Sequence, residues 1–134
     1  MPVDPFRELV AIMARLRGPD GCPWDREQTL EDLGRYIREE AEEVGQAIAS
    51  GDPRAVAEEL GDLLFNLIHA ARIAEEKGFF DLREVICGAR DKIVRRHPHV
   101  FGNATAATTA EVVAHWNRVK AEEKQARERE SADS

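Results

Sequence analysis

Long apolar runs, a basic cluster and paired cysteines are all missing from this sequence of 134 residues, and each absence excludes a class of protein. No apolar run approaches the roughly 18 residues that a membrane span needs, and the first ten residues lack the basic and apolar regions of a secretory leader. We therefore expect a cytoplasmic protein without a membrane partner. Cys22 and Cys87 form no CxxC pair, which argues against a zinc knuckle or a disulfide framework.

Basic residues are outnumbered, because 19 lysines and arginines stand against 26 aspartates and glutamates, a formal net charge of −7. Binding to a nucleic-acid polymer calls for a clustered basic face, so we expect no such partner. Dense carboxylates suit metal cations instead. The sequence also lacks a Walker A loop and the GxGxxG, HExxH and GxSxG motifs, which are the signals of the usual nucleotide-binding, zinc-protease and serine-hydrolase classes.

The sequence does contain apolar residues spaced three and four apart along most of its length, without the alternation typical of strands. This period predicts an all-α protein, a helical bundle of about five helices. Capping residues, glycines and prolines bound the predicted helices at about 5–17, 29–50, 53–77, 81–96 and from 108 onward. We predict one domain at 1–124 and a charged, frayed tail at 125–134.

Four carboxylates are brought together by the turn between the second and third predicted helices. Glu40 and Glu43 are three residues apart on one helix and Glu59 and Asp62 on the next, so each pair lies on one helical face. A turn at Gly51 sets Glu40 level with Asp62 and Glu43 level with Glu59, because each of these pairs is equidistant from it. The two helices therefore form a hairpin that carries a candidate active site.

Clustered carboxylates repel one another, and a bound cation would remove that conflict. Oxygen ligands on a rigid hairpin suit Mg²⁺, with Mn²⁺ as a possible substitute, and leave positions open for water and phosphate oxygens. A lone ExxE is more often a solvated helix face, but two matched pairs across one turn favour a site. A di-iron carboxylate bundle is the competing metal site, but it expects Glu-x-x-His on its helices, and this sequence has none.

The acidic motifs and their flanks resemble a known family. The segments REEAEEV at 38–44 and EELGDLLFNL at 58–67 look like the EExxE and ExxD motifs of MazG-type nucleoside triphosphate pyrophosphohydrolases. The segments LVAIMARLRGPDGCPWDREQT at 9–29 and KIVRRHPHVF at 92–101 are similar to the same family, more than to its dUTPase or phosphoribosyl-ATP hydrolase relatives. The resemblance extends from about Leu9 to Lys124.

This resemblance implies an all-α enzyme, dimeric or built from dimers, that depends on magnesium and hydrolyses nucleoside triphosphates to the monophosphate and pyrophosphate. Water would attack the α-phosphorus. The family's metal ligands map onto Glu40, Glu43, Glu59 and Asp62, and Glu39 could orient or deprotonate the water. Better-known members often carry two such domains in tandem, and this sequence looks most like the amino-terminal copy. The family favours a role in nucleotide-pool housecleaning.

Substrate contacts are also expected outside the acids, because phosphoryl transfer needs cations against the phosphate oxygens. Lys92 and Arg96 share a helical face, and the resemblance implies that this segment lies at the active site, so both are preferred to Arg95. Cations in the last turn of a helix can equally complement its dipole. His97 could form a hydrogen bond with phosphate or ribose, although an isolated histidine is more often structural. Asn66 continues the acid-bearing face of its helix and could bind metal through water or contact the sugar.

Two tryptophans are the aromatic candidates for stacking on a base, and either could instead be a core anchor. We prefer Trp116, in a segment similar to the family's WNxxK pattern, over Trp24. One hairpin and two further helices leave broad apolar faces, which predict a homodimer or a dimer of dimers that completes the bundle. The alternative to an enzyme is a non-catalytic helical dimerisation or regulatory module.

Overall fold

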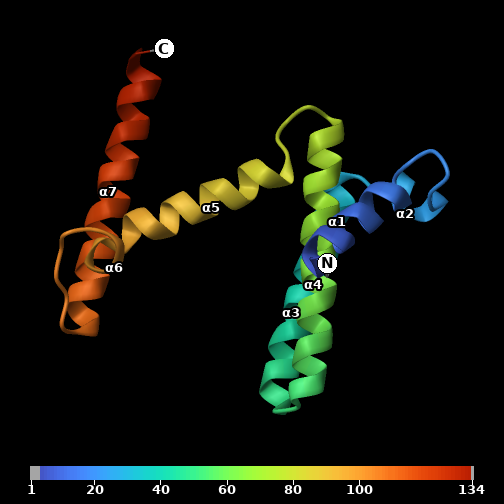
Figure 1. The fold of residues 1–134 in the computed structure, drawn as a ribbon, viewed down its shortest axis with the longest axis horizontal. Helices are drawn as coiled ribbons and strands as arrows, with labels where there is room; N and C mark the ends of the chain where they lie inside the picture. Colours follow the sequence, from blue (N-terminus) through green and yellow to red (C-terminus); the bar gives the residue numbers. More distant parts are fainter. Residues whose placement is uncertain (1–3, 134) are drawn as a thin grey trace. The chain divides into compact units, whose positions relative to one another are not determined.

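The protein is described by a computed structural model that covers residues 4–133, and these residues form seven α-helices and no strand (Figure 1). Residues 1–3 and 134, which fall within the predicted domain and tail, lie outside this described range. The helices are α1 (Pro5–Leu16), α2 (Pro23–Glu27), α3 (Leu30–Ser50), α4 (Pro53–Glu76), α5 (Leu82–Arg96), α6 (Pro98–Phe101) and α7 (Thr109–Asp133). The predicted all-α fold is confirmed, and none of the described helices is long and apolar enough to cross a membrane.

The five long helices coincide with the five predicted ones, because their ends lie at local signals. At the start of α3 the Thr29 hydroxyl accepts a hydrogen bond from the Asp32 amide at 3.2 Å, and the Asp32 carboxylate accepts one from the Thr29 amide at 2.9 Å. Asp52 caps α4, which begins with Pro53. The two additional helices, α2 and α6, are short, have proline at their start, and lie between the predicted helices.

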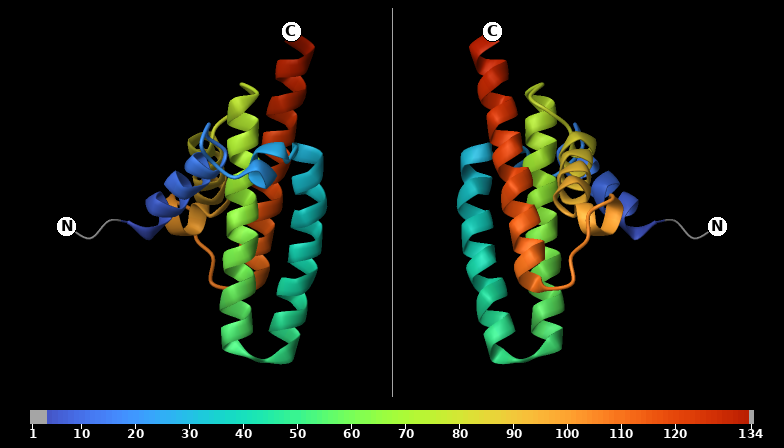
Figure 2. Two further views of the ribbon diagram at one scale, coloured as in Figure 1. Left: turned by 90° about the vertical axis from the view of Figure 1, so that its right-hand side faces the viewer. Right: turned by 90° about the vertical axis from the view of Figure 1, so that its left-hand side faces the viewer.

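Helices α3 and α4 form the predicted hairpin and pack side by side along their length (Figures 1 and 2). Gly51 ends α3 with a φ of 75°, a left-handed conformation that glycine adopts without steric cost. Asp52 then accepts a hydrogen bond from the Arg54 amide at 3.0 Å, so α4 starts directly after the turn. The turn therefore fixes the two acid-bearing helices antiparallel to each other.

The core of this part of the chain lies where α1 packs against α4 and α3 begins beside them. Met13, Leu33 and Ile68 are buried there, as their spacing predicts. Other apolar residues with the same spacing of three and four are exposed: Leu60, Leu64 and Leu67 on α4, Ile48 on α3 and Phe6 on α1. The described residues up to Val85 therefore leave the apolar helix faces that carry these five side chains uncovered.

The chain divides into two compact units, one ending at Val85 and the other beginning at Ile86, within α5. In the second unit α7 continues to Asp133, so the charged segment predicted as a tail is helical as far as residue 133. The predicted fraying of this segment, and the single domain at 1–124, stay predictions. Val119 is the one described residue of α5, α6 and α7 that is a buried hydrophobic.

Candidate active site

Three of the predicted acids converge on the hairpin. Glu40 and Glu43 of α3 and Glu59 of α4 each offer a carboxylate oxygen, and these three atoms lie within 4.8 Å of one another. Glu40 and Glu59 are half-buried and Glu43 is exposed. Glu40 Oε1 and Glu59 Oε2 are buried and have no hydrogen-bond partner among residues 4–133. A buried carboxylate oxygen without a partner is destabilising, so the group is short of a donor or a cation.

The protonation of Glu40 reflects the same conflict. The neighbouring Glu59 carboxylate, desolvation and the nearby Glu43 carboxylate together raise the pKa of Glu40 to about 8, because each disfavours a negative charge on this group. At neutral pH this carboxyl therefore keeps its proton unless another positive charge replaces it. Oxygen ligands around one Mg²⁺ or Mn²⁺ lie at most about 4–5 Å apart. Both the donor set and its spacing therefore fit a hard divalent cation held by Glu40, Glu43 and Glu59.

The remaining residues predicted for the hairpin lie beside this group. Asp62 is one turn beyond Glu59 on α4, exposed and outside the group of three. Asn66 is a further turn along and half-buried, and Glu39 is exposed next to Glu40. The structure thus brings together three of the four predicted ligands, and Asp62 follows on the same face of α4 by its spacing.

An aromatic pair lies one turn before the acids on α3. The Trp24 ring of α2 lies 5.8 Å from the Tyr36 ring, measured between centroids, with a tilt of 36° between the planes. Tyr36 is four residues before Glu40, so both side chains belong to one face of α3. Trp24 is 54% exposed, which leaves much of its ring available for stacking. Sequence reasoning named Trp24 and missed Tyr36, although the spacing of four from Glu40 is a signal that could have found it.

In the second unit, Arg96, His97 and Trp116 form a separate cluster. The Arg96 guanidinium lies 4.9 Å from the centroid of the Trp116 ring and donates to the Glu123 carboxylate at 2.8 Å. The His97 ring meets the Trp116 ring edge-on at 5.5 Å. Arg96, followed by Arg95, holds the pKa of Glu123 below its usual value. One face of Trp116 is therefore covered by Arg96, and the charge of Arg96 is offset by Glu123.

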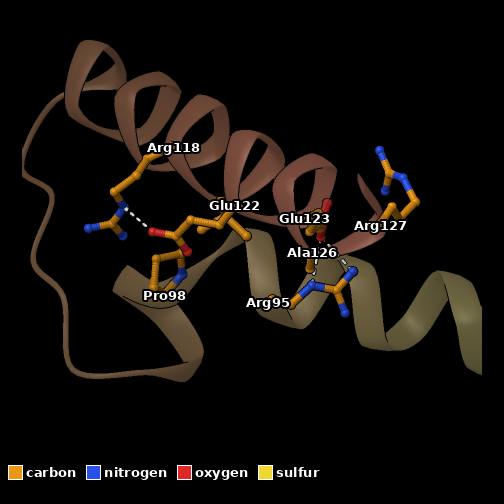
Figure 3. A pocket seen from close by; sticks show the side chains of 8 residues that line it. Arg95, Pro98, Arg118, Glu122, Glu123, Ala126 and Arg127 are labelled. Carbon is orange, nitrogen blue, oxygen red and sulfur yellow. Dashed lines mark hydrogen bonds and ion pairs between the residues drawn. The ribbon is translucent and has the colours of Figure 1, made fainter. Parts of the chain in front are cut away.

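A groove of about 590 Å³ lies on the same unit, between the end of α5, α6 and α7 (Figure 3). Figure 3 shows Arg95 directed at Glu123 and Arg118 directed at Glu122, with distances of 2.6 and 4.0 Å between the charged atoms. None of the predicted site residues lines the groove, and carboxylates offset two of its three guanidinium groups. Lys92 lies elsewhere on α5 and is exposed.

The fold and the carboxylate group together define an all-helical protein with a candidate divalent-cation site on a helix hairpin. The chain belongs to the MazG family, because its residues 28–101 match the MazG nucleotide pyrophosphohydrolase domain. A crystal structure of a mazG-related protein from Thermotoga maritima is similar, with a TM-score of 0.73 and 30% sequence identity, over 85% of this chain and 97% of that chain. The resemblance carried by the four sequence segments is thereby confirmed.

Curated relatives are similar over most of this chain. The nucleoside triphosphate pyrophosphohydrolase of Escherichia coli (strain K12) is 45% identical over 125 residues, 92% of this chain and 48% of the relative. The nucleoside triphosphate pyrophosphohydrolase/pyrophosphatase MazG of Thermotoga maritima is 44% identical over 119 residues, 89% of this chain and 45% of the relative. The chain therefore spans about half the length of these curated relatives.

Proposed function

We propose that this chain hydrolyses nucleoside triphosphates to the monophosphate and pyrophosphate, with Mg²⁺ held by Glu40, Glu43, Glu59 and Asp62. The observation that carries the proposal is the convergence of three carboxylates, two of them with a buried unpaired oxygen, in a chain of the MazG family. The name of the Escherichia coli relative supports the reaction. The cellular role that the family supports is nucleotide-pool housecleaning in the cytoplasm.

In the proposed reaction a water molecule attacks the α-phosphorus, and the bond from that phosphorus to the α,β-bridging oxygen breaks. Glu39 orients this water and accepts its proton, and pyrophosphate leaves with the bridging oxygen. A bound Mg²⁺ would supply charge stabilisation at the phosphate oxygens. The half-buried carboxylates of Glu40 and Glu59 fix the ligand oxygens, because both helices are held by the turn at Gly51.

The substrate contacts in this proposal are the residues predicted outside the metal ligands. Lys92, Arg96 and His97 bind the phosphates or the ribose, and Asn66 contacts the sugar or the metal's water. The contacts of Trp116 with Arg96 and His97 support a role in holding Arg96. The exposed Trp24, against Tyr36 on the acid-bearing face, is better suited to stack on the base.

The reaction is tested by measuring pyrophosphate and orthophosphate release from canonical and modified nucleoside triphosphates and deoxynucleoside triphosphates. Each substrate is incubated with Mg²⁺, with Mn²⁺ and with a chelator. We expect pyrophosphate and the monophosphate, and loss of both products when the chelator is present. Metal-dependent orthophosphate would mean that a different bond is cut, and the absence of any product would favour a non-catalytic dimerisation or regulatory module.

Matched variants on α4 tie the reaction to the acids. Glu59→Gln removes a ligand charge and should lower turnover more than about a hundredfold. Glu58→Gln makes the same chemical change at the exposed neighbouring position and should leave turnover within about twofold. Circular dichroism checks that both variants keep their helical content. Equal turnover in the two variants would remove the carboxylate group from the mechanism.

A further inference from the structure

A single guanidinium group joins three segments of the first unit that are far apart in the sequence. Arg17, at the end of α1, donates to both carboxylate oxygens of Glu76 on α4, at 2.7 and 2.9 Å. Its Nη1 donates to the carbonyl oxygen of Asp25 and, at 3.3 Å, to that of Gln28, where α2 ends. The same nitrogen lies 3.2 Å from Nε2 of His69 on α4.

Nearly all of the Arg17 side chain is buried in this arrangement. The side chain is 7% exposed, and His69 is 3% exposed. Burial lowers the pKa of His69, which favours a neutral ring beside the Arg17 guanidinium, and His69 Nε2 also lies 3.3 Å from the Asp25 carbonyl oxygen. Arg17 holds the pKa of Glu76 below its usual value. A fork of five donors can serve a carboxylate and two carbonyls at once, which a lysine ammonium cannot do in the same geometry.

The α2 segment depends on these contacts for its position. It is only five residues long, too short to be stable without tertiary contacts. Gln28, buried and held by Arg17, donates from its side-chain amide to the carbonyl oxygen of Trp24 at 2.8 Å. Before α2, the loop that contains Gly21 packs directly on the end of α1. A Cβ at Gly21 would overlap the carbonyl oxygens of Leu16 and Arg15.

We propose that Arg17 is a positioning residue for nucleotide binding. Its guanidinium group fixes α2 so that the exposed Trp24 ring stays against Tyr36, one helical turn from Glu40, and presents a stacking surface to the base. This inference rests on the proposed function. It assigns Arg17 a contribution to binding of the nucleoside part of the substrate and none to the chemistry at the α-phosphorus.

The kinetic test compares Arg17→Lys with the parent protein. Stacking on the base is the same in the ground state and the transition state, so we expect KM to rise about tenfold with kcat within about twofold. The inhibition constant of the product monophosphate should rise by the same factor, and that of magnesium pyrophosphate should not change. A fall in kcat at constant KM, or an equal rise for pyrophosphate, would overturn the assignment.

Arg72→Lys is the matched control. Arg72 lies on α4 and pairs with Glu75 at 3.6 Å and with Glu76, the carboxylate that Arg17 binds, at 3.8 Å. The control makes the same substitution beside the same carboxylate and should leave KM and both inhibition constants unchanged.

If Arg17→Lys does not fold, Glu76→Gln is the second variant. It weakens the contact between Arg17 and residue 76 without removing the guanidinium group, and KM should rise about threefold. An unchanged KM in a folded Glu76→Gln variant would contradict the inference.

A spectroscopic measurement separates this inference from the proposed function. Trp116→Phe leaves Trp24 as the only tryptophan. In that background Arg17→Lys should shift the Trp24 emission to longer wavelength and increase its quenching by acrylamide, whereas Arg72→Lys should do neither. If the parent protein hydrolyses no nucleotide, the proposed function fails. The Trp24 emission then still shows whether Arg17 holds Trp24 in place. An unchanged Trp24 emission in Arg17→Lys would overturn the positioning role.

Discussion

The carboxyl group of Glu40 makes the stability of the hairpin depend on pH and on divalent cations. Its pKa of about 8, against an ordinary value of 4.5, means that the folded protein binds this proton more tightly than the unfolded chain does. The resulting stabilisation is complete below the unfolded pKa and is lost as the pH rises through about 8. In the presence of a chelator, the Tm should therefore fall between pH 5 and pH 8. Added Mg²⁺ should raise the Tm more at pH 8 than at pH 5, because it replaces the proton.

Thermal unfolding followed by circular dichroism measures both effects. Glu40→Gln cannot ionise and should flatten the pH dependence of the Tm. Glu42→Gln makes the same change at an exposed position of α3 outside the carboxylate group, and should leave the dependence as it is in the parent. A parent-like pH dependence in Glu40→Gln would show that the pH effect on stability originates at another group.

At the same scale, residues of the site differ in how far the sequence could predict them. Glu40, Glu43 and Glu59 were predictable because helical spacing and one tight turn fix their positions. Arg17 was not predicted, since Glu76 and His69 are 59 and 52 residues away along the chain and no local pattern links them. Long side chains that satisfy distant backbone carbonyls depend on tertiary packing, which periodicity does not encode.

Among the elements, the α3–α4 hairpin depends on the left-handed conformation of Gly51. Gly51→Ala should destabilise the protein by about 1 kcal/mol, because a side chain at a φ of 75° is strained. Gly45→Ala is the opposite control: this glycine lies inside α3, where an added Cβ would meet nothing within 4 Å. It should stabilise the protein by about 0.5–1 kcal/mol through helix propensity. Urea unfolding measures both, and a loss of stability at both positions would contradict the assignment to backbone conformation.

The same local signals explain which helices the sequence could predict. The long helices begin and end at capping residues and glycines, such as the capping box of Thr29 and Asp32, and these act within a few residues. Helix α2 lies between two predicted helices and was not predicted, because five residues carry no periodicity. The carbonyl oxygens of Asp25 in α2 and of Gln28 directly after it accept hydrogen bonds from Arg17, a contact from outside the segment. Short elements of this kind follow from tertiary contacts and not from local sequence.

For the whole molecule, the distribution of apolar side chains predicts self-association. Among its described residues the second unit has one buried hydrophobic residue, Val119, and several large hydrophobic residues that are at least two fifths exposed. These exposed residues are Ile86, Ile93, Val94, Val100, Phe101 and Val113. In the first unit the stripe Leu60, Leu64 and Leu67 on α4 is similarly exposed. Apolar faces of this extent are usually covered by another chain or another domain.

We expect a homodimer, or a dimer of dimers, with a mass in size-resolved light scattering of at least twice the 15.0 kDa of the chain at micromolar concentration. Leu64→Glu places a charge in the middle of the α4 stripe and should shift the population towards the monomer, because burying an unpaired carboxylate opposes association. Gln46→Glu adds the same charge at an exposed polar position of α3 and should leave the mass unchanged. A parent protein that is monomeric at this concentration would show that the exposed stripe is not a dimer interface. An equal decrease in the measured mass of both variants would show that net charge, and not the stripe, causes the dissociation.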